Sequence, residues 1–155
     1  MKNSLIHAAK SALFLLLVTG LFAACSNSTG SDHDDEQEPI GFKIKQNGLV
    51  VIAEPTTSSK TDSLTVSEGS TTTFTVVFID EDGDEFTPDP DEHSITLETQ
   101  SSIISFININ SDVAPFSFDV VAQSVGTGTF DLKMLHEGAA EFTRPGLPFE
   151  VTSSN

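Results

Sequence analysis

Hydrophobic and polar residues alternate with a period of two through most of the chain from Ile40 onward. The apolar members of five such runs are Phe74, Val76 and Phe78; Ile95 and Leu97; Phe116, Phe118 and Val120; Phe130, Leu132 and Met134; and Leu147, Phe149 and Val151. Alternation of this kind places one face of a strand in a core and the other in water. Since no stretch shows a sustained helical period, we expect an all-β domain.

Glycine-containing turn signals separate these runs. Asn47-Gly48 lies between two short apolar segments and predicts a tight hairpin. The other signals are Glu68-Gly69, Asp82-Gly83, Val125-Gly126 and Pro145-Gly146, of which the last is expected to precede the final strand. About seven or eight short strands between residues 40 and 155 predict an antiparallel β-sandwich of two sheets. Phe has to fill its core, because the chain contains 12 Phe and no Trp or Tyr.

The N-terminal segment has a different pattern. Lys2 and Lys10 precede an apolar run of 13 residues, from Ala12 to Ala24. A membrane-spanning helix needs about 20 residues, so this run is too short to remain as an anchor. A basic head, an apolar middle and small residues at the end are typical of a secretory signal peptide. We therefore expect residues 1–24 to be cleaved.

The apolar run ends in Phe22-Ala23-Ala24-Cys25, and Cys25 is the only cysteine in the chain. This segment resembles the lipobox of bacterial lipoproteins, in which the cysteine is lipidated and becomes the mature N-terminus. The resemblance implies that the protein is attached to a membrane through the lipid. Because Ser26 follows the cysteine, it implies the outer membrane, on either the periplasmic or the surface face. The alternative is cleavage by the ordinary signal peptidase near Ser26 and release of a soluble protein.

Residues 25–39 are polar, and five acids crowd their second half. Such a segment cannot bury enough apolar surface to fold, so we expect a flexible tether. The whole chain has a net charge of −16, and loss of Lys2 and Lys10 with residues 1–24 makes it −18. Repulsion from anionic lipid should keep the domain away from the membrane surface. The same charge opposes nucleic-acid binding, which depends on Lys and Arg.

Four segments of the predicted sandwich carry a family resemblance: Leu64–Gly69, Phe74–Gly83, Gly126–Phe130 and Leu147–Val151. Their order and their turn glycines resemble those of bacterial Ig-like domains, over about residues 62–152. The chain is thus similar to bacterial lipoproteins that carry a single Ig-like domain. The resemblance implies an Ig-like β-sandwich and a location in the cell envelope, and it brings no common catalytic site.

The first candidate site is the acidic segment 80–92, which contains eight acids and no base. Asp80, Asp82 and Asp84 have the spacing of the first three Ca²⁺ ligands of an EF-hand. The rest of that pattern fails, because the glycine is at position 83 rather than 85 and Asp91 stands where a bidentate Glu is needed. The alternative interpretation is an acidic hairpin loop whose charge keeps a sheet edge soluble.

The second candidate site involves histidine. His136-Glu137 begins a segment that is one residue short of a zinc-protease motif, because Ala140 replaces the second His. That motif requires a helix, which Gly138 opposes, so we expect a loop at the end of a strand. His93 and His136 could form a zinc or copper site with a carboxylate only if the fold brings them together.

The sequence contains no nucleophile elbow and no phosphate-binding glycine loop. We therefore expect a protein that is not an enzyme: a lipid-anchored, non-catalytic binding or interaction module of the cell envelope, whose partner could be another envelope protein. Metal binding, by Ca²⁺ at the acidic segment or by Zn²⁺ or Cu²⁺ at the histidines, is the alternative function. Apart from such a metal ion, no cofactor is expected.

Overall fold

The computed structural model describes residues 37–54 and 63–154. They belong to one compact unit that begins at Gln37. The predicted signal peptide, Cys25 and most of the predicted tether lie outside the described residues, and those predictions stay predictions. The part of the chain that the structure describes has no helix long and apolar enough to cross a membrane.

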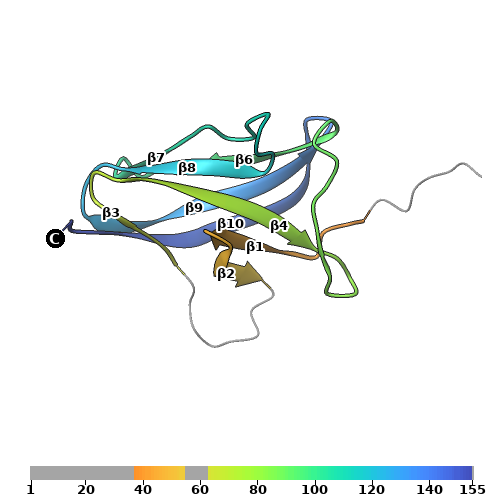
Figure 1. Ribbon diagram of the computed structural model, residues 1–155, viewed down its shortest axis with the longest axis horizontal. Coiled ribbons are helices and arrows are strands. Elements are labelled where there is room, and N and C mark those ends of the chain that lie inside the picture. Colours follow the sequence, from red (N-terminus) through yellow and green to blue (C-terminus); the bar gives the residue numbers. More distant parts are fainter. Residues whose placement is uncertain (1–36, 55–62, 155) are drawn as a thin grey trace, which may run out of the picture. The chain divides into compact units, whose positions relative to one another are not determined.

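The described residues form β-strands connected by turns and loops, which confirms the all-β prediction. The strands are β1 (Gly41–Gln46), β2 (Leu49–Glu54), β3 (Leu64–Ser67), β4 (Thr71–Ile79), β5 (Glu85–Phe86), β6 (His93–Glu98), β7 (Ile104–Ile107), β8 (Ser117–Ala122), β9 (Gly126–His136) and β10 (Ala139–Thr152). They are arranged in two sheets (Figure 1). One sheet has the order β2-β1-β4-β8-β7, with β5 also paired to β4, and the other has the order β3-β10-β9-β6.

The strand order is that of an Ig-like sandwich. An Ig domain places strands B, E and D in one sheet and C, F and G in the other. Here β4, β8 and β7 take the B, E and D positions, while β6, β9 and β10 take the C, F and G positions. Among these six strands the chain therefore crosses between the sheets from β4 to β6, from β6 to β7 and from β8 to β9, and the prediction of an Ig-like β-sandwich is confirmed. The short strand β3 adds to this second sheet by pairing in parallel with β10.

The structure describes ten strands, more than the seven or eight predicted. The two additional strands are β5, which has two residues, and β7, which has four. The predicted β1–β2 hairpin extends the first sheet beyond β4. Asn47 and Gly48 join β1 to β2 with φ values of 50° and 79°. Positive φ at both central residues is the signature of the type I′ turn, so the hairpin predicted from Asn-Gly is confirmed.

The core lies between the two sheets and consists of the alternating residues identified in the sequence. All the apolar members of the five runs are buried. Seven phenylalanines are among the largest side chains that are less than 2% exposed: Phe42, Phe74, Phe78, Phe116, Phe118, Phe130 and Phe149. Phe78 meets Phe116 edge-on at a centroid distance of 6.1 Å, and Phe74 stacks on Phe118 at 5.6 Å. Phenylalanine thus fills the core in the absence of Trp and Tyr.

One predicted turn is absent. Pro145-Gly146 was expected to precede the last strand, but β10 runs through it without interruption. The register against β9 shifts between Arg144 and Leu147, so the segment is a bulge. A bulge accommodates a proline, which cannot donate a ladder hydrogen bond, and a glycine with φ of 75°. The Gly146 N–H is satisfied by the Asp131 carboxylate at 2.9 Å.

Candidate functional site

The fold brings His93 and His136 together at one end of the sandwich. His93 is the first residue of β6 and His136 is the last residue of β9, and they are direct partners in the antiparallel ladder. Their imidazole rings stack with centroids 4.5 Å apart and an angle of 15° between the planes. Figure 1 shows the β9–β10 turn and the start of β6 at the same end, remote from the C-terminus.

A tight turn follows His136. Glu137 and Gly138, with φ values of 49° and 85°, join β9 to β10, and these values again indicate a type I′ turn. The segment that is similar to a zinc-protease motif therefore forms a turn at the end of a strand, as predicted. The Glu137 N–H donates to the Glu92 carbonyl oxygen at 2.9 Å, which ties this turn to the segment that leads into β6.

A β-bulge supplies a carboxylate to the same place. The β9–β10 register shifts between Ala140 and Phe142, which makes Glu141 the extra residue of the bulge. Bulges redirect a side chain that a regular ladder would place elsewhere. The Glu141 Oε2 atom lies 3.5 Å from Nε2 of His93. The three neighbouring strands β6, β9 and β10 thus contribute one side chain each.

His93 is the most deeply buried of the three. Its side chain is only 4% exposed, whereas that of Glu141 is 26% exposed. The carbonyl oxygen of Asp89 lies 2.8 Å from the His93 backbone nitrogen and 3.2 Å from Nδ1 of its ring. Because a carbonyl oxygen only accepts, this contact places a proton on Nδ1 and turns Nε2 toward Glu141.

The donor atoms of His93, His136 and Glu141 all lie within 4.8 Å of one another. Among the described residues, they are the one group of three potential ligands that converge in this way. Acidic residues flank the group in sequence, since Glu92 precedes His93 and Glu137 follows His136. The described Lys and Arg side chains form their ion pairs with other glutamates: Lys43 and Lys45 with Glu85, Lys133 with Glu98, and Arg144 with Glu54.

The acidic segment predicted to bind Ca²⁺ has a different geometry. Asp80 is only 9% exposed, and its Oδ1 accepts hydrogen bonds from the backbone N–H groups of Asp82 and Asp84 at 3.1 and 2.9 Å. The Gln37 side chain donates to its Oδ2 at 2.9 Å. Asp80 therefore organises the turn after β4, while Asp82 and Asp84 are exposed. The calcium prediction stays a prediction, and the convergence found at the histidines is not found here.

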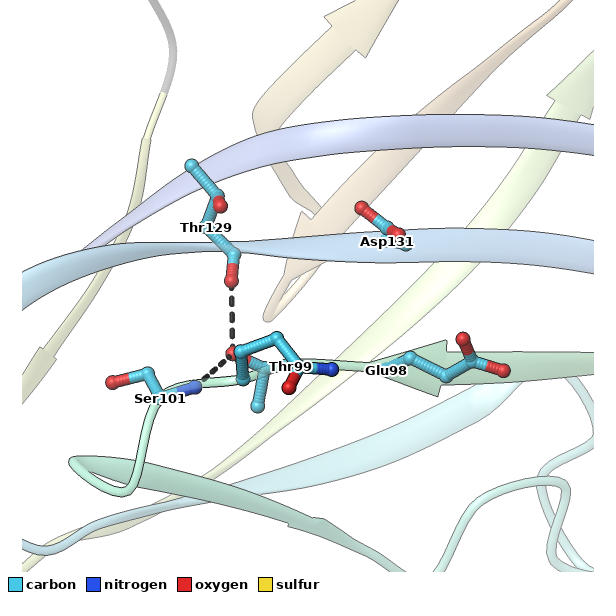
Figure 2. A pocket seen from close by; sticks show the side chains of 6 residues that line it. Glu98, Thr99, Ser101, Thr129 and Asp131 are labelled. Atoms are coloured by element: carbon cyan, nitrogen blue, oxygen red, sulfur yellow. Dashed lines mark hydrogen bonds between the residues drawn. The ribbon is translucent and has the colours of Figure 1, made fainter.

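Two hollows lie beside β6 on the surface of the described residues. The first, of about 250 Å³, lies at the end of β6. Figure 2 shows Thr99 at its centre, where the hydroxyl donates to the Thr129 carbonyl and accepts from the Ser101 N–H. Its carboxylates are already engaged within the chain, Glu98 with Lys133 and Asp131 with the Gly146 N–H. The polar groups named here are therefore bonded within the chain, and this hollow offers no ready ligand site.

The second hollow, of about 300 Å³, adjoins His93. Its lining includes Ser94 and the loop between β7 and β8, with Asn110 and Asp112. Asn110 covers the outer edge of β6, because its side chain donates to the Ile95 carbonyl at 2.7 Å and accepts from the Ile95 N–H at 2.9 Å. An amide side chain thus takes the place of a neighbouring strand beside the histidines.

Sequence reasoning identified the two histidines and left the carboxylate unnamed. Glu141 is one of 23 acids, and no spacing distinguishes it from the others. Its role depends on the bulge, which follows from the packing of β10 against β9 and leaves no local signal in the sequence. Partnership of His93 with His136 likewise depends on strand register.

No family model matches the sequence, and no curated protein matches it. Among solved structures, the chain is similar to domains 4 and 5 of the S-layer protein SbsC, with a TM-score of 0.40 and 17% identity over 74% of this chain and 54% of that chain. It is also similar to SbsC domains 4–9, with a TM-score of 0.36 and 15% identity over 60% of this chain and 13% of that chain. The chain thus spans about half the length of the first of these structures.

Proposed function

We propose that this chain is a bacterial lipoprotein of the cell envelope whose Ig-like domain is a non-catalytic binding module. The observation that carries the binding role is the convergence of His93, His136 and Glu141 at one end of the sandwich. In Ig-like folds the ends of the sandwich are where loops gather and where binding surfaces are built. The neighbouring strands β6, β9 and β10 form a rigid frame, because their inner faces are packed into the core.

The anchor is proposed from the sequence alone. Cys25 follows an apolar run that is too short to span a bilayer, and residues 25–39 would connect the lipid to the domain. One acyl chain holds a protein only weakly, whereas two or more hold it stably. Fully extended, a tether of this length reaches about 50 Å, so that an acidic domain repelled by anionic lipid stands away from the membrane. Ser26 favours the outer membrane as the site of anchoring.

The experiment replaces Cys25 by Ser and follows the protein in cells fed with a labelled palmitate analogue. We expect the original chain to carry the label and to sediment with membranes, and the Cys25→Ser variant to lose both properties. Ser28→Ala, a neighbouring change that keeps the cysteine, serves as the control. If Cys25→Ser remains labelled and membrane-bound, or if mass spectrometry of the original protein finds an unmodified N-terminus, the proposed anchor is wrong.

The second candidate function is metal capture by the same envelope protein. It is favoured by the meeting of the His93 and His136 imidazoles and the Glu141 carboxylate, since the two histidines are far apart in the sequence. The acidic character of the domain would raise the local concentration of cations near the site. Metal capture and binding of an envelope partner are compatible with one another, because a metal ion is one possible ligand of a binding module.

A further inference from the structure

We infer that His93, His136 and Glu141 form a site for one borderline divalent transition-metal ion, Zn²⁺ or Cu²⁺. The inference rests on the proposed binding role and names the ligand class for it. It is supported by the donor set, the spacing of the donor atoms, the orientation of His93 and the frame of strands.

The donor set selects the class of metal. Imidazole nitrogen suits Zn²⁺ and Cu²⁺, and two histidines with one glutamate are a known zinc donor set. Ca²⁺ and Mg²⁺ instead prefer oxygen ligands, and Ca²⁺ takes about six to eight of them. Since two of the three donors here are nitrogens, the site should discriminate strongly against these hard cations. Three protein ligands leave a fourth position for water or for a ligand from outside.

The spacing of the donors is close to what one ion requires. Metal–ligand bonds of about 2.0–2.1 Å in tetrahedral geometry place neighbouring donor atoms about 3.3 Å apart. The Nε2 atom of His93 and the Oε2 atom of Glu141 are already 3.5 Å apart. All donors of the group lie within 4.8 Å, so the remaining pairs have to approach by about 1.5 Å at most. Because the two imidazole rings are stacked nearly parallel, His136 has to turn out of the stack to share an ion with His93. His136 and Glu141 are both less buried than His93, so these two side chains are the ones that would move.

The Asp89 carbonyl oxygen orients the His93 ring toward Glu141. Its Nδ1 contacts the Asp89 carbonyl oxygen, which only accepts, so in a neutral ring Nε2 carries a lone pair. The Nε2 atom, the nitrogen available to a metal ion, therefore faces Oε2 of Glu141 at 3.5 Å. A backbone carbonyl bound to the second ring nitrogen is also how proteins orient metal-ligating histidines.

The frame of the site is built into the fold. His93 and His136 are fixed opposite each other by the β6–β9 ladder, and the bulge in β10 directs Glu141 to the same side. The tight Glu137-Gly138 turn is bonded to the Glu92 carbonyl and holds the ends of these strands together. A metal ion bound between β6, β9 and β10 would therefore be held by side chains of β-strands, whose positions are better fixed before binding than those of loop residues.

The test uses the full chain in detergent, freed of metal with a chelator, and measures Zn²⁺ and Cu²⁺ binding by competition with a chromogenic indicator. We expect one ion per chain, with no comparable binding of Ca²⁺. His136→Ala removes a direct ligand and should lower the affinity for Zn²⁺ and Cu²⁺ by more than roughly 10–100-fold, the usual effect of removing a residue that only supports a ligand. Glu141→Gln keeps the shape of its side chain and should weaken Zn²⁺ binding by about tenfold or more. Paramagnetic resonance of the Cu²⁺ form should show coupling to two nitrogens, reduced to one in His136→Ala.

Two matched controls separate this site from other acids and histidines. His33→Ala removes a histidine of the predicted tether, and the double variant Asp82→Asn, Asp84→Asn removes two carboxylates of the acidic loop. Both should bind Zn²⁺ as the original chain does. Circular dichroism checks that each variant is folded. Since His93 is buried and its replacement could unfold the domain, the test relies on the less buried His136 and Glu141.

Several outcomes would overturn the inference. One is the absence of Zn²⁺ and Cu²⁺ binding, and another is binding that is unchanged in both His136→Ala and Glu141→Gln. A third is nuclear magnetic resonance of the imidazole nitrogens of His93 and His136 that shows no change on adding Zn²⁺. None of these measurements depends on acylation of Cys25, so the metal site and the anchor can fail separately.

Discussion

Gly128 lies directly opposite Phe149 in the β9–β10 ladder, and the space left by its missing side chain is filled by the Phe149 ring. A Cβ atom at position 128 would lie 2.6 Å from Cζ and 2.8 Å from Cε1 of that ring. Phe149 is only 1% exposed and packs in the core, so its ring has little room to move. Glycine is needed here because of the close approach of an aromatic ring.

We therefore expect Gly128→Ala to lower the free energy of unfolding by about 1–3 kcal/mol, the usual cost of overpacking a core. Urea unfolding followed by circular dichroism measures it. Thr127→Ala, on the exposed face of the same strand, is the control and should change little. Phe149→Leu in the Gly128→Ala background should cost less than Phe149→Leu alone. Strictly additive effects of the two changes would show that the ring and the added methyl group do not meet.

The second prediction concerns the edge of β6. Asn110, in the left-handed conformation with φ of 54°, bonds both the N–H and the carbonyl of Ile95. Asn110→Ala removes both hydrogen bonds and also strains the backbone, so we expect a loss of about 1–3 kcal/mol in unfolding free energy. Hydrogen exchange should show faster exchange of the Ile95 amide in particular. Exchange that speeds up equally throughout β6 and β9 would contradict a local role for Asn110.

The third prediction concerns pH. Glu85 receives hydrogen bonds from Lys43 at 2.8 Å and from Lys45 at 2.5 Å, and these bonds hold the pKa of its carboxyl below the ordinary value. A carboxyl whose pKa is lowered on folding adds stability above its unfolded pKa, and this stability is lost as the pH falls through the folded-state pKa. Because the pair is exposed, the contribution at neutral pH should stay below about 1 kcal/mol.

Glu85→Gln should accordingly be less stable than the original chain at neutral pH and equal to it at strongly acid pH. Melting temperatures across the acid range measure the difference. Glu68→Gln, in the exposed turn before β4, removes the same charge and serves as the control. A difference between Glu85→Gln and the original chain that grows toward acid pH would have the wrong sign for this ion pair.

The fourth prediction concerns the acidic loop. Because Asp80 accepts the Asp82 and Asp84 N–H groups, Asp80→Ala should destabilise the fold by about 1–2 kcal/mol, whether or not Ca²⁺ is present. Millimolar Ca²⁺ should leave the melting temperature of the original chain unchanged, since the Asp80 oxygens are already occupied. A rise in melting temperature that Asp82→Asn abolishes would instead support the predicted calcium site.

Much of the fold is predictable because its cause is local. The side chains of a strand alternate between two faces, so the apolar members of a run such as Phe130, Leu132 and Met134 indicate the core without knowledge of any partner strand. The Asn47-Gly48 hairpin is predictable for the same reason, because two residues with positive φ define the turn by themselves. Pro145-Gly146 was misread because turns and bulges favour the same residues, and only the partner strand distinguishes them.

The candidate site is predictable only in part. His93 and His136 were recognised as potential ligands by residue type, but they are separated along the chain by two crossings between the sheets. Glu141 gave no signal at all, because a bulge arises from the way β10 accommodates the register of β9. A shift of one residue in the β6–β9 ladder would send one histidine to the opposite face and abolish the cluster.

The sequence by itself determined which residues face the core, where the first hairpin turns and that the chain is all-β, since these follow from the two-residue period of a strand and from the conformational preferences of single residues. Only the tertiary structure decided which strands lie side by side, and with it the meeting of His93, His136 and Glu141. The physical reason is that pairing between distant strands is selected by the packing of both sheets together. No short segment of the chain contains that information.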